Sequence, residues 1–315
     1  MFQTLSLIID IFTKVLLPVL SMAGIGVVAH RWCRYDMQTL VRLNLYLFVP
    51  VFLFTRIADS TLQWSEIGRV GLAVMLPILI LGGLLLAGMK KSGARSETIA
   101  AVLLGGLLFN AANFGIPVAQ LAFDKSGGQV QALVVMYLNT TLFVMGYMLM
   151  AAVQGKGLIS GAMSYFKLPM FYMIVAGFAV RETGVGMPLW LDKATHTLAE
   201  AMSPIALVTL GAQLATRARW PRWRVVGPIV IVKLLAFPAM MGLVVWALGL
   251  WPWPGAQLVL AAAAPTAINT LLLTIELNGD ADTAADGVFW TTLLSAFSVT
   301  LVLGVVQSLG GKPPG

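Results

Sequence analysis

Ten long apolar stretches follow one another along this chain and leave almost no residues for anything else. A transmembrane helix needs about 20 mostly apolar residues to cross the hydrocarbon layer, and stretches of this kind meet that requirement. The longest connection, residues 153–166, is too short to fold by itself. We therefore predict an all-helical integral membrane protein with ten transmembrane helices. They run approximately over residues 4–29, 37–57, 67–89, 97–123, 128–152, 166–182, 189–215, 224–249, 255–278 and 284–309.

The composition agrees with a membrane protein, and the absence of catalytic motifs from the sequence argues against an enzyme. Charged residues make up 10% of the chain, against about a quarter in a soluble domain, and hydrophobic residues make up 59%. The single cysteine, Cys33, cannot form an intramolecular disulfide. The chain contains no HExxH, GxSxG or Walker A motif and no histidine pair at metal-ligand spacing. We expect no enzyme activity, cofactor or metal site.

The basic residues indicate how the chain is oriented. The net charge is +7, and the loops after the odd-numbered helices hold eleven lysines and arginines against six on the other side. By the positive-inside rule, both termini should lie outside and residues 217–224 in the cytoplasm. The sequence RARWPRWR at those residues is typical of an interfacial anchor, so the charge is not interpreted as a nucleic-acid site.

Prolines recur in corresponding helices of the two halves of the chain. Pro50 and Pro204 fall in the second helix of each half, and Pro77 and Pro238 match more loosely in the third. The fourth helices hold NAANFGIP at residues 110–117 and APTAINT at residues 264–270. This common order predicts two five-helix repeats, residues 1–152 and 153–315, in opposite orientations within one membrane domain.

The two polar motifs predict broken helices that cross in the middle of the membrane. A proline removes an amide donor and clashes with the carbonyl one turn earlier, so the helix opens. Unpaired backbone groups persist at membrane depth only where protein or a water-filled cavity satisfies them. Half-helix N-termini would then point partial positive charge at a common spot, beside asparagine amides. Such a spot is suited to binding a small anion.

These same residues carry a resemblance to a known family. NAANFGIPVAQLAF with YLNTTLFVMG, and APTAINTLLLTIELNGDADTAA with WTTLLSAFSVTL, resemble the two signature regions of the auxin efflux carrier family. VPVFLFTRIA and SPIALVTLGAQLA resemble its second and seventh helices, so the resemblance extends over residues 5–309. That family includes bacterial malonate and malate carriers and the plant PIN-type auxin carriers. The large cytoplasmic loop of the long plant members is absent, which favours the bacterial branch.

The resemblance implies a fold, an activity and a set of site residues. The fold is a five-plus-five inverted repeat with crossing helices 4 and 9, related to sodium/proton antiporters and bile acid transporters. The activity is secondary transport of a small organic anion, such as malonate or malate, by alternating access across a bacterial inner membrane. The expected binding residues are Asn113, Asn269, Asn110, Asn139, Pro117, Pro265 and Thr266. Either Asn110 or Asn113 corresponds to the family's helix 4 asparagine, and Asn110 and Asn139 could equally serve as helix caps or helix contacts.

Few other polar residues interrupt the apolar stretches. Lys14 is expected to pair with Asp10 one turn away, and Lys233 to snorkel to the cytoplasmic surface. Glu276 is a candidate for coupling to a proton or sodium ion, while Asp280, Asp282 and Asp286 are expected in a solvated loop.

Two other functions are weighed against the organic anion carrier. A cation/proton antiporter should have paired aspartates at the crossover, where this chain has asparagines, and a membrane receptor would bind a ligand without transporting it. The expected partners are an organic anion and the lipid bilayer, with a coupling ion and a second copy of the chain left open.

Overall fold

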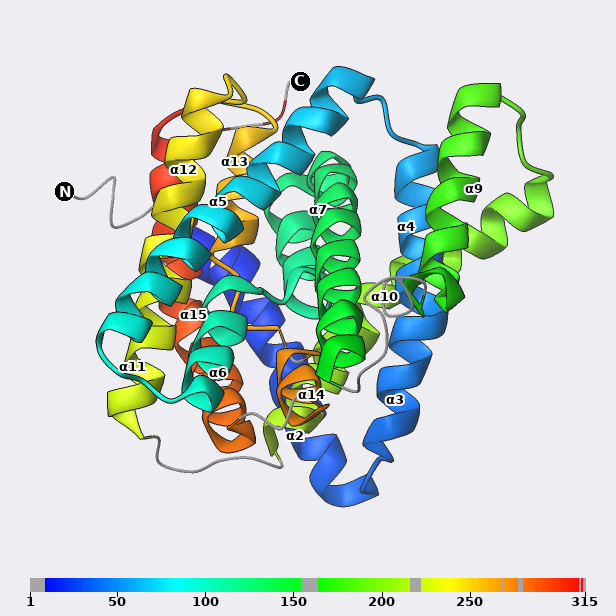
Figure 1. Cartoon of the computed structure of the whole chain (residues 1–315). Helices are drawn as coiled ribbons and strands as arrows, with labels where there is room; N and C mark the ends of the chain where they lie inside the picture. Colours follow the sequence, from blue (N-terminus) through cyan, green and yellow to red (C-terminus); the bar gives the residue numbers. More distant parts are fainter. Residues whose placement is uncertain are drawn as a thin grey trace.

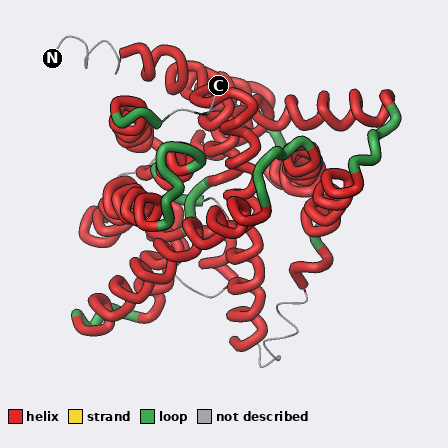
Figure 2. The backbone as a smooth tube through the Cα atoms, turned by 90° about the horizontal axis from the view of Figure 1, so that it is seen from above, coloured by secondary structure: helices red, strands yellow, loops and turns green. Residues whose placement is uncertain are grey.

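The protein is helical in the part of the chain that the structure, a computed structural model, describes: residues 9–153, 164–215, 222–267, 269–276, 280–311 and 313. Figures 1 and 2 show these helices from the side and from above. The elements of the first half are η1 (Phe12–Leu16), α2 (Leu17–Cys33), α3 (Met37–Leu43), η2 (Asn44–Phe48), α4 (Val49–Ala58), α5 (Trp64–Lys91), α6 (Ser96–Leu107), η3 (Ala111–Gly115) and α7 (Ile116–Val153).

The second half has a similar succession of long and broken helices. Its elements are η4 (Ser164–Lys167), α9 (Pro169–Thr183), α10 (Leu189–Ala215), α11 (Trp223–Ile231), η5 (Val232–Ala236), α12 (Phe237–Ala247), α13 (Gly255–Ala262), α14 (Asn269–Glu276) and α15 (Ala281–Ser308). Apart from η4, which is a 3₁₀ helix, the η elements are π-helical turns.

Six continuous helices in the described part are long and apolar enough to cross a membrane, which confirms the expected class of protein. They lie at residues 9–33, 37–58, 64–91, 189–215, 223–247 and 281–308. The two stretches expected to be irregular, 97–123 and 255–278, are each broken in the middle. The stretch 128–152 is part of α7, which turns sharply at Phe123 and Asp124. The stretch 166–182 coincides with the shorter α9 to within three residues at each end. The ten-helix inverted repeat stays a prediction.

The helices pack into two groups. The first helix group consists of α2, α3, α4, α9 and α10, in which α2 packs along α10 and α4 packs between α9 and α10. The second helix group consists of α5, α6 and α11–α15, and α7 packs against both groups. Figure 1 shows α3, α4 and α9 on one side of α7, with α11, α12, α13 and α15 on the other. The surface between the two groups is where the polar segments of the sequence meet.

The π turns share a sequence cause. Each of the four in the described part ends two residues before a proline. A proline ring clashes with the carbonyl four residues earlier, and a widened turn moves that carbonyl away without ending the helix. These prolines therefore bend their helices rather than open them. The four prolines are Pro18, Pro50, Pro117 and Pro238.

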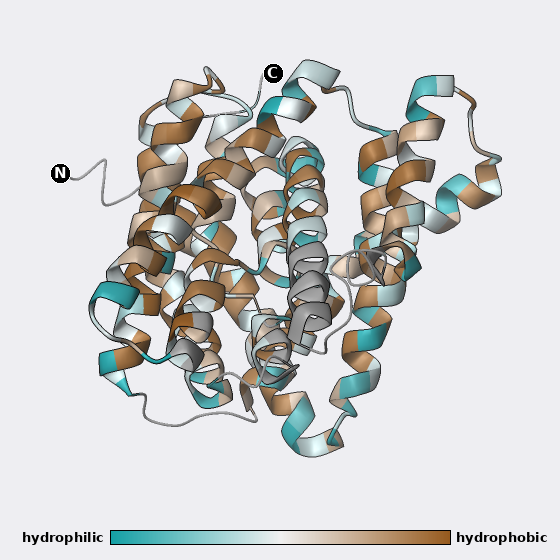
Figure 3. Ribbon diagram, in the orientation of Figure 1, coloured by the Kyte–Doolittle hydropathy of each residue, from teal (hydrophilic) through white to brown (hydrophobic). Residues whose placement is uncertain are grey.

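The outer faces of the helices are apolar, as a lipid environment requires. Large hydrophobic side chains such as Trp246 and Phe297 are 77% and 74% exposed. Hydrophobic colours predominate along the helices in Figure 3. A water-soluble protein rarely exposes such a continuous apolar surface, whereas lipid solvates it without cost. The exposed side chains are thus consistent with membrane burial of both helix groups.

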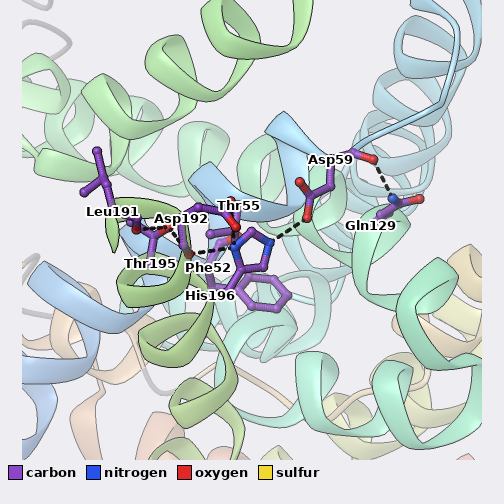
Figure 4. A network of polar contacts seen from close by, with 8 residues as sticks. All are labelled: Phe52, Thr55, Asp59, Gln129, Leu191, Asp192, Thr195 and His196. Carbon is purple, nitrogen blue, oxygen red and sulfur yellow. Dashed lines mark hydrogen bonds and ion pairs between the residues drawn. The ribbon is translucent and has the colours of Figure 1, made fainter. Parts of the chain in front are cut away.

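A polar network ties α10 to α4 and α7 near one end of the first helix group (Figure 4). The Nε2 atom of His196 lies 3.0 Å from Oδ2 of Asp59, and its Nδ1 atom lies 2.9 Å from the carbonyl oxygen of Asp192. Gln129 of α7 donates to the carbonyl oxygen of Asp59 at 2.8 Å. Here polar side chains hold helices from different parts of the sequence together.

Two sequence expectations about charged residues are wrong, and a third is confirmed. Lys233 does not reach the surface: its side chain is fully buried, because η5 directs it between aromatic rings. The acidic run is not a solvated loop, because it begins α15, and Asp286 is buried within that helix. The ion pair between Lys14 and Asp10 is present, at 3.4 Å.

Asp280 has a defined role at the start of this helix. Its carboxylate accepts hydrogen bonds from the amide of Thr283 and from Arg222, each at 3.0 Å. Burial raises the pKa of Asp280, but these hydrogen bonds outweigh it and leave the pKa below its usual value.

The closest helix contact of the first helix group depends on glycine. A Cβ atom placed on Gly26 of α2 would lie 2.2 Å from the carbonyl oxygen of Val208, and one on Gly211 of α10 would lie 1.8 Å from that of Ala23. Both contacts are with backbone atoms, which cannot rotate away. Small residues at both positions therefore allow α2 and α10 to approach closely, as in many membrane helix pairs.

We expect Gly26→Ala to destabilise the protein by about 1–3 kcal/mol, because the added methyl group forces the two helices apart. The midpoint of thermal unfolding in detergent would measure this loss. Gly24→Ala is the matched control, because it lies on the same helix and nothing lies within 4 Å of its added methyl group. Equal midpoints for the two variants would contradict the close contact.

Candidate functional site

The two broken helices cross and are joined by their backbones. Phe109 and Thr266 form an isolated antiparallel bridge. The amide of Asn110 donates to the carbonyl oxygen of Pro265 at 2.7 Å, and the amide of Ala267 donates to that of Leu108 at 3.0 Å. Backbone groups that the breaks release from helical pairing thus find partners in the opposite segment. This satisfies the requirement that buried backbone groups be hydrogen-bonded.

Thr266 adds side-chain contacts to this crossing. It is fully buried, and its hydroxyl donates to the carbonyl oxygen of Gly105, near the end of α6, at 2.6 Å. Its amide donates to the hydroxyl of Thr291 of α15 at 3.0 Å. The crossing is therefore anchored to a third helix, which fixes where the two breaks meet.

Different residues produce the two breaks. In the second, Pro265 disfavours helical geometry at the preceding residue, so α13 ends at Ala262. In the first, the backbone is extended at Leu108, and the side chain of Asn110 accepts a hydrogen bond from the amide of Asn113 at 3.1 Å. Asparagine is a favourable residue at such a helix start. Pro117 lies further along and accounts for the π turn η3, not for the break itself.

Two buried glutamines form hydrogen bonds that hold the segment after the first break in place. The Nε2 group of Gln131 donates to the carbonyl oxygen of Ala111 at 2.7 Å, and that of Gln257 donates to Oε1 of Gln131 at 2.7 Å. Gly115 is required here, because a Cβ atom would lie 2.4 Å from Nε2 of Gln131. This chain of amides from α13 through α7 holds η3 in position.

A cavity of about 50 Å³ opens beside the crossing, between the two helix groups. That is room for roughly four water-sized groups, which suits a small molecule. Its polar lining consists of amide side chains, and the rest is apolar. The lining residues are Val41, Asn44, Leu45 and Val49 of α3, η2 and α4, Gln213 of α10, and Phe109–Asn113, Asn139, Ala267 and Asn269 around the crossing.

The electrostatics of the cavity come from helix ends. Each broken helix has a first half, α6 or α13, and a second half that begins after the break. The lining includes residues at the start of both second halves, 109–113, 267 and 269, and no residue of α6 or α13. Helix starts carry partial positive charge. Carbonyls near the end of α6 are already paired, since those of Gly105 and Leu108 accept hydrogen bonds across the crossing. The local field therefore favours a negative group.

The structure brings together four of the residues that the sequence singled out. Asn110, Asn113, Asn139 and Asn269 all line the cavity. The Nδ2 group of Asn139 also lies 4.0 Å from the sulfur of Met170 in α9.

Of the remaining candidates, the three whose side chains are described do not line the cavity. Pro117, Pro265 and Thr266 are buried near the crossing, where they shape it rather than face the cavity. Glu276 ends α14, and its side chain is outside the described part of the chain.

Asn44 is a lining residue that the sequence reasoning missed. It is 3% exposed, and both its Oδ1 and its Nδ2 atoms are buried without a hydrogen-bond partner among the described residues. A signal was present: Asn44 stands six residues before Pro50, and so begins the π turn η2. A polar side chain at the start of a proline-induced π turn is directed inward here, toward the crossing. It places an amide from the first helix group opposite the asparagines of the crossing.

We expect Thr266→Val to destabilise the fold by about 1–3 kcal/mol, because the carbonyl of Gly105 loses its partner while the shape of the side chain is kept. Thermal unfolding in detergent would test it. Thr292→Val is the control, since that buried hydroxyl donates only within α15, to the carbonyl oxygen of Val288. If Thr292→Val lost as much stability as Thr266→Val, the hydrogen bond from Thr266 to Gly105 would contribute no more than an ordinary hydrogen bond within one helix.

Comparison with known proteins gives two matches. Residues 158–303 match the family described as "Membrane transport protein". The chain is also 26% identical, over 318 aligned positions, to a protein of Rhizobium meliloti (strain 1021) named "Putative malonate transporter". That alignment covers 94% of this chain and 96% of that protein, so the similarity extends through both halves and both breaks. These matches agree with the family expected from the sequence: the second half of the chain matches a membrane transport family, and nearly the whole chain is similar to a protein named as a transporter.

Proposed function

We propose that this protein is a secondary transporter that carries a small carboxylate, such as malonate, across the cytoplasmic membrane, and that the cavity at the crossing is its binding site. The observation that carries the proposal is the set of amides around that cavity. Asn44 and Gln213 face it from the first helix group, and Asn113, Asn139 and Asn269 face it from the other side.

The chemistry of this lining favours an anion that must also be released. Amide groups donate hydrogen bonds to a carboxylate without adding a full positive charge, and two helix starts contribute favourable dipoles. A site with a fixed ion pair would hold the ligand more tightly and release it slowly. The residues described around the cavity include no carboxylate, which counts against a cation/proton antiporter.

The position of the cavity suits alternating access. It lies between the two helix groups, so a relative displacement of the groups would open it to one side of the membrane and close it to the other. The ligand would stay at the crossing while its surroundings move. No ATP-binding motif is present in the sequence, so the ligand's own gradient or that of an ion must supply the driving force.

The choice of a dicarboxylate rests on size and on the relative. A cavity of about 50 Å³ excludes large substrates in this conformation. The name of the Rhizobium meliloti relative includes malonate, whose two carboxylates could contact amides on opposite sides of the cavity. Malonate is therefore the first substrate to test, with malate as the second.

We expect Asn113→Ala and Asn269→Ala each to weaken malonate binding roughly tenfold or more, because a hydrogen bond to a charged group contributes about 1.5–3 kcal/mol. Isothermal titration calorimetry on the purified protein in detergent would measure the dissociation constants. Both variants should keep the thermal stability of the parent.

Gln120→Ala is the matched control, because this amide bonds to Ser203 and does not line the cavity. It should bind malonate as the parent does. If the two asparagine variants also bound like the parent, or if malonamide, a neutral analogue, bound equally well, the crossing would not be a carboxylate site.

A further inference from the structure

Lys233 is a buried basic residue that the proposed binding site does not use. It lies on the π turn η5, in the middle of the span 223–247, and its side chain is 0% exposed. Its Nζ atom has no hydrogen-bond partner and no ion pair within the described part of the chain. Intramembrane lysines are costly and are usually retained for a function.

Aromatic rings enclose this amine. The Nζ atom lies 4.0 Å from the ring centroid of Phe237 and 4.6 Å from that of Phe109. The two rings also contact each other, with centroids 5.6 Å apart. Aromatic faces attract a cation, so this environment tolerates the protonated amine better than an aliphatic one would. It does not supply a counterion.

Phe109 connects Lys233 to the cavity. The same residue forms the backbone bridge with Thr266 and lines the cavity. Lys233 is therefore one aromatic side chain away from the place where the anion is proposed to bind. In surroundings of low dielectric constant, the interaction between a charged Lys233 and an anion in the cavity is only weakly screened.

Among the side chains that the structure describes, no carboxylate forms an ion pair or a hydrogen bond with Lys233. The turn η5 packs against α6, α11, α12 and α15. The charged residue of α11 is Arg224, nine positions before Lys233, and α12 has none. In α6, Glu97 stands in the first turn. In α15, Asp282 stands in the first turn and is exposed, and Asp286 stands one turn further. Gly287, which follows Asp286, is the residue of this turn that approaches the side chain of Ile229, four positions before Lys233.

We propose that Lys233 couples transport to protons: the amine takes up a proton when a carboxylate occupies the cavity and releases it when the carboxylate leaves. This inference rests on the proposed function. A bare ammonium enclosed in apolar surroundings is unfavourable, so the amine is neutral while the cavity is empty. A bound anion offsets that cost, and by linkage the proton strengthens anion binding by the same factor. The proton comes from the water on the side where the anion enters and leaves with it on the other.

Calorimetry of malonate binding in buffers of different ionisation enthalpy counts the protons taken up. The parent should take up about one proton per malonate bound, whereas Lys233→Met should take up nearly none. The apolar methionine matches the buried environment, so this variant is expected to fold. Lys233→Arg, which holds its proton permanently, should bind malonate with no proton uptake.

Two controls separate this role from others. Lys14→Met removes an exposed, paired lysine and should keep the proton count of the parent. Glu276→Gln tests the alternative coupling residue and should also leave the count unchanged.

The outcomes distinguish this inference from the proposed function. The role of Lys233 alone would be overturned if the parent bound malonate without taking up a proton. It would also be overturned if Lys233→Met took up as many protons per malonate as the parent. Absence of malonate binding by the parent would overturn the proposed function and this inference with it.

Discussion

Two backbone hydrogen bonds, between residues 108–110 and 265–267, fix the place where the two broken helices meet. Open helix ends at membrane depth leave polar groups that lipid cannot satisfy, so the breaks are stable only because each segment pairs with the other. The rest of the site follows from this constraint. The pairing places the starts of two half-helices at one cavity, and Thr266, Gln131 and Gln257 then hold the segments in that arrangement.

The sequence predicted the class of fold and the two helix breaks, because both depend on simple patterns. Apolar stretches separated by short polar breaks indicate membrane helices, and NAANFGIP and APTAINT marked the two breaks. Asn110, Asn113, Asn139 and Asn269 do converge on one cavity. The causes of the breaks were only partly foreseen, since Pro265 lies in one break while Asn110, rather than Pro117, begins the helix after the other.

What the sequence did not predict depends on side-chain direction. The π turns before Pro50 and Pro238 rotate Asn44 and Lys233 inward, and a 3.6-residue period cannot anticipate that rotation. Lys233 was therefore expected at the surface, whereas it lies between Phe109 and Phe237. Both unexpected residues are on the segments that face the crossing. The same prolines that bend the helices thus bring polar groups to an otherwise apolar interior.

The central claim is that the cavity binds a carboxylate and opens in turn to each side of the membrane. Its most direct test is maleimide labelling of a single cysteine at Ala112, which lines the cavity, after Cys33 is changed to serine. A membrane-impermeant maleimide would be applied to right-side-out and inside-out vesicles with and without malonate. We predict labelling from both sides and protection by malonate from both. Labelling from one side only, or labelling that malonate does not slow, would contradict the account.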